Sequence, residues 1–241
     1  MDIFKSWLVE KYIAHRGLHS SEVAENSLTA FSLAIEKNYP IEIDVQLISD
    51  GTVVVFHDEI LSRSTGKDGY LKNLTKKELK KTFLKGTKDT IHTFEEVLKL
   101  VDGKIPLLIE IKNTQKVGEL EAKVLDLLKN YKGEFAIQSF NPYVLMWFKQ
   151  NAPEILRGQL SCSFKGEKMA FFKKFVLKRM LLNKSSKPNF ISYCGQDLPN
   201  RFVKRYNKIP LLAWTIRSQE DYMKVVKYCD NIIFEDFEPT I

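Results

Sequence analysis

Short apolar runs rich in β-branched residues recur along the chain, and several of them are separated by segments with the apolar spacing of a helix. The strand-like runs begin near residues 12, 41, 53, 107, 135, 157, 189, 209 and 231. Strands that alternate with helices indicate parallel βαβ units. The pattern therefore predicts an α/β protein with a mostly parallel sheet.

One pair of runs predicts a β-hairpin. IEIDVQL (41–47) and VVVFHD (53–58) flank Asp50-Gly51, a dipeptide that favours a tight turn. With one run assigned to the hairpin, about eight strands remain for the main sheet. That number predicts a single TIM-type (β/α)8 barrel over residues 1–241, with a hairpin and small insertion after the second strand. An open doubly wound sheet is the alternative, although no G-x-G-x-x-G follows any strand.

Helical patterns lie between the strands. The first follows a candidate cap at Asn26 or Ser27, and Leu28, Phe31 and Ile35 share one face of it. Further helices are expected over 75–83, 93–101, 118–131, 142–151 and 199–207, and from Ser218 onward.

Composition fits an ordinary globular protein. Apolar residues make up 44% of the 241 positions and charged residues 28%. The three cysteines lie far apart without a C-x-x-C pair, which argues against a disulfide framework and against a thiolate zinc site. The amino terminus is a poor signal peptide, and no apolar run approaches about 18 residues. We therefore expect a cytoplasmic protein without a transmembrane helix.

The net charge of +7 favours anionic partners. Residues 164–187 contain eight basic residues and only one acid, Glu167. Within this segment, residues 168–182 have the composition of a basic amphipathic helix, which can lie on an anionic membrane. The alternative is a barrel helix that packs its phenylalanines on the strands. Nucleic-acid binding is not expected, because the aromatic residues follow core-like patterns.

Glu42 and Asp44 are the first candidates for chemistry. Residues two apart on a strand share a face, so both carboxylates point the same way. Paired carboxylates repel unless a cation or protons lie between them, and hard divalent cations prefer such oxygen ligands. A solvent-facing edge strand with alternating acids is the alternative.

Two histidines follow strand-like runs. His15-Arg16-Gly17 combines a side chain that titrates near neutrality with a guanidinium that binds phosphate in a bidentate manner. His57 precedes Asp58 at the end of the hairpin, which would return this histidine to the two carboxylates. Taken alone, the His15-Arg16 pair could be a chance surface pair, and His57 could be a structural histidine hydrogen-bonded at a strand end.

Glu110 and Lys112 repeat the two-residue spacing on a later strand and add a third carboxylate and a cation. An ordinary ion pair is the alternative. Together with the preceding residues, they supply the equipment for metal-assisted displacement at phosphorus.

These motifs resemble the glycerophosphodiester phosphodiesterase family. The similarity is dense over residues 13–112 and thinner through residue 216. It is carried by HRG (15–17), ENS (25–27), IEIDVQL (41–47), VVFHDE (54–59), IEIK (109–112), QSF (138–140) and AWTI (213–216).

The resemblance implies a TIM-type barrel that hydrolyses a glycerophosphodiester to sn-glycerol 3-phosphate and an alcohol. It implies Ca²⁺ or Mg²⁺ as the cofactor, with Glu42, Asp44 and Glu110 as its ligands. It also implies His15 and His57 as the general acid/base pair.

For the substrate, the resemblance implies that Arg16 clamps the phosphate with Lys112 nearby, and that Trp214 lines the alcohol side of the pocket. The last strand departs from the family pattern and carries Glu235, which leaves the alcohol preference open. A lysophospholipase D-type or cyclising enzyme acting on lipid diesters is the alternative. A non-enzymatic basic barrel is a third possibility, against which the presence of every catalytic position argues.

Overall fold

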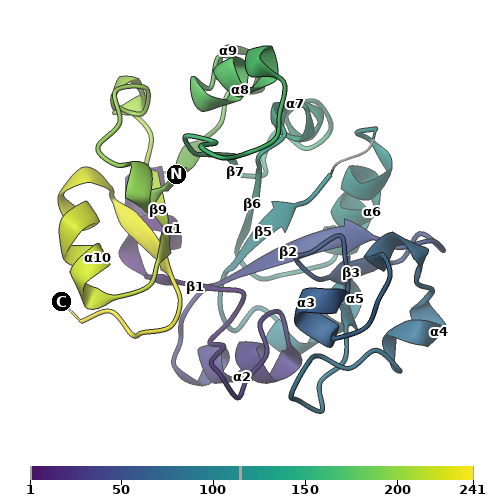
Figure 1. Cartoon of the computed structure of the whole chain (residues 1–241). Helices are drawn as coiled ribbons and strands as arrows, with labels where there is room; N and C mark the ends of the chain where they lie inside the picture. The colour runs from purple at the N-terminus through teal and green to yellow at the C-terminus, as the bar shows by residue number, and fades with distance from the viewer. Residues whose placement is uncertain (1, 114–115, 241) are drawn as a thin grey trace. The chain divides into compact units, whose positions relative to one another are not determined.

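The computed structural model describes residues 2–113 and 116–240. The chain divides into two compact units, the amino-terminal unit (Ala14–Phe135) and the carboxy-terminal unit (Ala136–Ile241 together with Met1–Ile13). In Figure 1 the amino-terminal unit runs from purple to teal, and the long segment of the carboxy-terminal unit runs from teal to yellow.

Parallel strands form the centre of the amino-terminal unit. β2 (Ile41–Leu47) pairs on one side with β1 (Ile13–His15) and on the other with β5 (Leu107–Ile111). All residues of β1 and β5 and the first five of β2 are buried. Burial on both faces explains why these strands read as nearly continuous apolar runs.

The predicted hairpin is confirmed. β3 (Val53–Val55) pairs antiparallel with β2, and Gly51 occupies the turn with a φ of 76°, a conformation that favours glycine. β4 (His92–Thr93), a two-residue strand that the sequence pattern did not reveal, pairs antiparallel with β3. The insertion has an apolar core of its own, formed by Ile48, Val54, Phe56, Leu61, Leu71, Leu79, Leu84 and Ile91.

The helices of this unit begin at recognisable caps. The hydroxyl of Ser27 accepts a hydrogen bond from the Ala30 amide at 3.0 Å and starts the first of them. The helix expected over 75–83 is shorter than predicted, because Phe83 pairs in an antiparallel bridge with Thr90. The helical elements are α2 (Leu28–Glu36), α3 (Ser62–Thr65), η2 (Leu71–Asn73), α4 (Lys76–Leu79), α5 (Phe94–Val101) and α6 (Glu119–Leu128).

Parallel strands also form the centre of the carboxy-terminal unit. Consecutive strands pair side by side, which is the arrangement expected of repeated βα units. The strands are β6 (Phe135–Ser139), β7 (Arg157–Ser161), β8 (Phe190–Cys194), β9 (Leu211–Ile216) and β10 (Asn231–Phe234).

The helix expected over 199–207 is wrong: only η4 (Lys204–Tyr206) forms there. The side chain of Asn200 accepts a hydrogen bond from the Phe202 amide at 2.8 Å, as a helix cap would. A longer helix would place four like charges three or four residues apart, which destabilises a helix: Arg201, Lys204, Arg205 and Lys208. The other helical elements are η1 (Ile3–Lys5), α1 (Trp7–Glu10), α7 (Pro142–Asn151), α8 (Phe171–Lys178), α9 (Asn183–Ser186), η3 (Gly195–Asp197), α10 (Gln219–Val225) and η5 (Val226–Tyr228).

The fold class is confirmed. Strands β1, β2, β5 and β6 to β10 are the eight strands of a TIM-type (β/α)8 barrel, and β3 and β4 belong to the insertion after the second strand. Within residues 2–113 and 116–240, no helix has the length and apolar character needed to cross a membrane.

Candidate active site

Three buried carboxylates come together on neighbouring strands of the amino-terminal unit. Glu42 and Asp44 lie on β2, and Glu110 lies opposite Asp44 on β5 in the parallel register. Each side chain offers one oxygen within 4.8 Å of the others, and no more than 8% of any of the three residues is exposed. The structure therefore brings together the three residues that the sequence singled out as metal ligands.

Burial and mutual repulsion control the charge of this cluster. Burial raises the pKa of Glu42, and the charges of Asp44 and Glu110 raise it further. Burial also raises the pKa of Glu110, with Lys112 opposing the shift and Asp44 adding to it. Burial would raise the pKa of Asp44 as well, but Lys112 and Arg16 outweigh it and hold that pKa far below its usual range. Asp44 is ionised, whereas its two neighbours lack enough nearby positive charge to ionise freely.

A divalent cation fits this donor set. The available ligands are carboxylate oxygens, which hard cations such as Ca²⁺ and Mg²⁺ prefer. A cation among Glu42, Asp44 and Glu110 would offset the burial and the repulsion that together raise two of their pKa values. The cluster is therefore a candidate metal site.

Two cations border the carboxylates. The Nζ atom of Lys112 lies 2.6 Å from Oε1 of Glu110 and 3.1 Å from Oδ1 of Asp44. Arg16 follows β1 in a left-handed conformation with a φ of 55°. Its Nε lies 3.1 Å from Oδ2 of Asp44, and its Nη1 donates to Oε1 of Glu25 at 2.8 Å. Both predicted phosphate-binding side chains thus lie beside the candidate metal site.

Both predicted histidines also lie near this cluster. His15 neighbours Glu42 in the register of β1 and β2, and its Nε2 is 3.9 Å from Oε2 of Glu42. His57 follows the hairpin strand β3, as the Asp50-Gly51 turn predicted. Both imidazoles are close enough to Asp44 for their positive charge to lower its pKa.

The environment of His57 favours a neutral imidazole with a defined tautomer. Its Nδ1 lies 2.7 Å from Oδ1 of Asp58. Because an ionised carboxylate only accepts hydrogen bonds, Nδ1 carries the proton and Nε2 carries the lone pair. Burial lowers the pKa of His57, and Lys112 and Arg16 lower it further against the opposing charge of Asp44. A neutral Nε2 is suited to accept a proton.

A chain of ion pairs, not anticipated from the sequence, joins His57 to Arg16. Arg63 donates from Nε to Asp58 at 2.6 Å, and its Nη1 and Nη2 donate to the two oxygens of Glu25 at 3.0 and 2.6 Å. Glu25 in turn binds Arg16. Glu25 belongs to the ENS run that the family resemblance includes, but nothing local indicates a partner 38 residues away.

Two amide side chains support the site. The Nε2 atom of Gln46 donates to the carbonyl oxygens of residues 56, 57 and 58 at 2.8, 3.0 and 3.2 Å. The Nδ2 atom of Asn26 donates to Oδ2 of Asp44 at 2.9 Å. From sequence, Asn26 is expected only as a helix cap, but it also holds a candidate metal ligand. Sequence reasoning missed Gln46, although its spacing from Glu42 and Asp44 places all three on one face of β2.

The remaining predicted site residue, Trp214, lies on β9 of the carboxy-terminal unit. Its ring centroid is 5.5 Å from that of Phe140 in a nearly perpendicular contact, and Phe140 in turn contacts Phe164 at 6.1 Å. Glu235 of the same unit forms an ion pair with Arg217, whose Nε lies 2.6 Å from Oε1 of Glu235. The role of Trp214 toward the alcohol stays a prediction.

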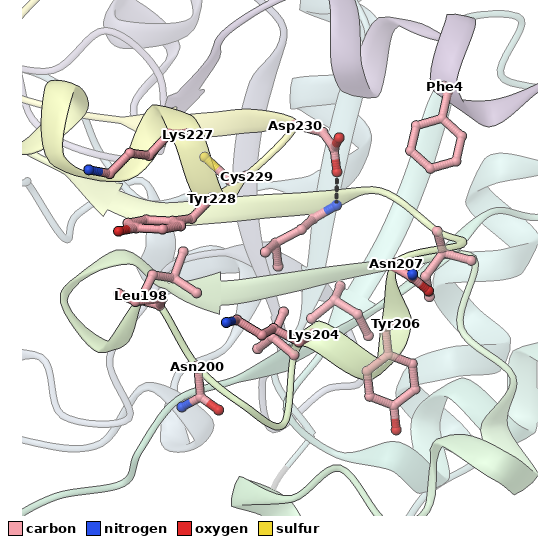
Figure 2. Close-up of a pocket in the computed structure, with 15 residues that line it drawn as sticks. Phe4, Leu198, Asn200, Lys204, Tyr206, Asn207, Lys227, Tyr228, Cys229 and Asp230 are labelled. Atoms are coloured by element: carbon pink, nitrogen blue, oxygen red, sulfur yellow. Dashed lines mark hydrogen bonds between the residues drawn. The ribbon is translucent and has the colours of Figure 1, made fainter.

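Each unit contains a cavity. One of about 320 Å³ in the amino-terminal unit is lined by Gln46 and Tyr70 among others, and Lys112 is the predicted site residue in its lining. Another of about 310 Å³ in the carboxy-terminal unit contains none of the predicted site residues in its lining (Figure 2). There the carboxylate of Asp230 accepts a hydrogen bond from the Leu211 amide at 2.8 Å.

A TIM-type barrel that carries a buried carboxylate cluster, two cations and two imidazoles at its strand ends has the equipment of a phosphoric diester hydrolase. Comparison with known proteins identifies the group within this class. The sequence model of the "Glycerophosphoryl diester phosphodiesterase family" matches residues 15–237, and the chain belongs to this family. The resemblance seen in the sequence and the predicted enzyme class are thereby confirmed.

Similar sequences and solved structures cover almost the whole chain. A glycerophosphodiester phosphodiesterase from Caldanaerobacter subterraneus subsp. tengcongensis is 34% identical over 244 residues, which cover 95% of each protein. A phosphodiesterase from Oleispira antarctica, solved in complex with the product sn-glycerol-3-phosphate, is 26% identical with a TM-score of 0.80 over 95% of this chain and 94% of that chain. A glycerophosphodiester phosphodiesterase from Thermotoga maritima is 28% identical with a TM-score of 0.72 over 93% and 94%.

Proposed function

We propose that this protein hydrolyses glycerophosphodiesters to sn-glycerol 3-phosphate and an alcohol, using one divalent cation, Ca²⁺ or Mg²⁺. The observation that carries the proposal is the cluster of Glu42, Asp44 and Glu110 beside His15 and His57, in a chain of this family. The sn-glycerol-3-phosphate bound as product in the Oleispira antarctica relative supports the choice of substrate.

Glu42, Asp44 and Glu110 would hold the cation. When bound, it would neutralise charge on the phosphate oxygens and make attack at phosphorus easier. The burial of all three carboxylates supports this role, because a cation among them would offset the desolvation of their charges.

Arg16 and Lys112 would bind the phosphate. Glu25 and Asp44 engage two nitrogens of the Arg16 guanidinium, which fixes the group while leaving further N–H donors for a phosphate oxygen. Lys112 lines a cavity of about 320 Å³, and its ammonium, which lies beside Asp44 and Glu110, can meet the same phosphate. A guanidinium held before substrate arrives loses little freedom on binding.

His57 would act as the general base. Its lowered pKa keeps the imidazole neutral near pH 7, and the bond to Asp58 leaves the lone pair on Nε2. His15, whose Nε2 lies 3.9 Å from Oε2 of Glu42, would then protonate the leaving alcohol. We assign Trp214 to the alcohol side of the substrate, where an aromatic ring suits the apolar atoms of a head group.

The test is release of glycerol 3-phosphate from glycerophosphocholine and glycerophosphoethanolamine, with added Ca²⁺ or Mg²⁺ and again with EDTA. We expect metal-dependent release that falls by about 10² or more in a Glu42→Gln variant. A matched Glu95→Gln variant, which removes an exposed carboxylate on α5, should retain full activity.

The other outcomes are also informative. Release that is unaffected by EDTA would contradict the metal assignment. If neither soluble diester is cut but choline is released from lysophosphatidylcholine, the lysophospholipase D-type alternative would be favoured. No cleavage of any of these diesters under either metal would refute the proposed function.

A further inference from the structure

The positive charge of this protein is concentrated in one segment of the carboxy-terminal unit. The chain has 37 basic and 30 acidic residues, and residues 164–187 hold eight of the former and one of the latter. Outside this segment the two kinds of residue are therefore equal in number, 29 of each. The whole net charge of +7 arises from 24 consecutive residues, which is the pattern of a local binding surface for an anionic partner.

Helix α8, in the middle of this segment, exposes its phenylalanines. Phe171 is 84% exposed and Phe172 is 76% exposed, and α8 contains no buried residue. The sequence also allowed a helix that packs its phenylalanines on the strands. That alternative is wrong for Phe171 and Phe172. Leu181, shortly after α8, is also 43% exposed. Adjacent large apolar side chains at this level of exposure mark an interaction site.

Lysines lie close in sequence to the exposed rings. Lys168 and Lys173 are exposed, and Lys174 and Lys178 are partly exposed. None of the ion pairs within the described ranges, residues 2–113 and 116–240, involves these four side chains. Their charges are therefore available to an external partner.

An arginine cluster extends the basic surface beyond α8. The guanidinium of Arg179 lies 3.8 Å from the ring centroid of Phe175 and 5.4 Å from that of Phe202. Arg201 and Arg205 also approach Phe202, at 4.9 and 5.6 Å. The rings hold these guanidinium groups in place while their charge stays at the surface.

We propose that α8 and its basic neighbours dock the protein on the surface of an anionic lipid bilayer. Phe171 and Phe172 would enter the boundary between head groups and acyl chains, and the lysines and arginines would contact lipid phosphates. Charge complementarity selects an anionic partner. The two highly exposed apolar rings favour a bilayer over a nucleic acid, because consecutive helical residues point about 100° apart and form no flat stacking platform.

The proposal is independent of the proposed hydrolysis. It concerns the location of the protein, and its binding test uses no substrate. It can therefore fail while the hydrolysis assay succeeds, and the reverse also holds.

The test is sedimentation of the full chain with vesicles of phosphatidylcholine alone or mixed with phosphatidylglycerol. We expect binding to the mixed vesicles at low salt, little binding to pure phosphatidylcholine, and weaker binding in 0.5 M NaCl. A Phe171→Ser/Phe172→Ser variant should bind about 10–100-fold more weakly, from the loss of two inserted rings. A Lys173→Gln/Lys174→Gln variant should bind about 25-fold more weakly, at about fivefold per lysine near an anionic surface.

Matched controls isolate the surface. Lys88→Gln/Lys132→Gln removes the same charge from exposed positions of the amino-terminal unit, and Met223→Ser removes an exposed apolar side chain of α10. Both controls should bind as the wild type does. The variants on α8 should also melt at the same temperature as the wild type, which shows that they fold.

Three results would overturn the proposal. The first is no sedimentation with anionic vesicles at low salt. The second is equal loss of binding in the control and α8 variants. The third is tight binding to single-stranded DNA, or self-association through α8, without vesicle binding.

Discussion

Replacing Asp58 with Asn is expected to reverse the hydrogen bond that orients His57. Arg63 donates from Nε to Oδ2 of Asp58 at 2.6 Å, and an arginine N–H needs an acceptor. In the variant, the single amide oxygen would therefore face Arg63, and the NH₂ group would face Nδ1 of His57. That arrangement requires the lone pair on Nδ1 and moves the proton to Nε2, so the nitrogen that faces the reaction could no longer accept a proton.

The expected loss follows from this geometry. An isosteric change that only weakened the bond would cost about tenfold, since a charge-assisted hydrogen bond contributes about 1.5–3 kcal/mol and an amide oxygen retains part of it. A reversed bond removes the general base, which accounts for about 10²–10⁴ in rate. We therefore expect kcat of Asp58→Asn to fall about as far as kcat of His57→Ala.

A steady-state assay of glycerol 3-phosphate release would measure this loss in both variants. Asp126→Asn is the matched control, because Asp126 forms an exposed ion pair with Lys129 away from the cluster. Adding Arg63→Met to Asp58→Asn frees the amide to rotate and should recover part of the activity. A kcat for Asp58→Asn within about threefold of the wild type would refute the reasoning.

Three further predictions concern stability, metal and pH. Gly17→Ala should destabilise the fold by about 2–4 kcal/mol, because the positive φ of +82° is strained for alanine and the new carbon would also lie 2.9 Å from the Ala30 backbone. Gly51→Ala has the same strain at a φ of +76° but meets only side-chain ends of Lys123 and Glu119, so thermal melts should show a smaller loss for it. Ca²⁺ or Mg²⁺ at about 100 times its Kd should raise the stability of the wild type by about 2.7 kcal/mol but not that of Glu42→Gln, and an equal rise in melting temperature would contradict the site. Because burial lowers the pKa of His57, kcat/KM should fall with decreasing pH through a limb below about 6.5, and a limb above 7 would contradict its assignment as base.

Much of the fold could be predicted because its signals are local. Nine strand-like runs correspond to the eight barrel strands and β3, since each is a short apolar run bounded by polar residues. β4 was missed because a two-residue strand has no periodicity to detect. The helix expected over 75–83 is shorter because Phe83 pairs with Thr90. The helix expected over 199–207 is absent because it would bring basic residues three and four apart into repulsion.

Some residues of the candidate site could be predicted from local rules, and others could not. The two-residue spacing of Glu42 and Asp44 places them on one face, and the parallel register then sets Glu110 beside Asp44, so local rules suffice for the carboxylates. Arg63 and Glu25 could not be predicted to meet, because their contact spans 38 residues and depends on how the insertion packs.

The insertion has an apolar core of its own, and this core positions the residues that orient His57. Its core includes Phe56 and Leu61, which flank the loop from His57 to Ile60 on both sides. Gln46 holds the same loop from β2 through three carbonyl oxygens. Arg63 then binds Asp58 from within the insertion. A mobile loop would leave the Asp58 carboxylate free to rotate away from the imidazole, so the packing of the insertion is what makes a single tautomer of His57 persist.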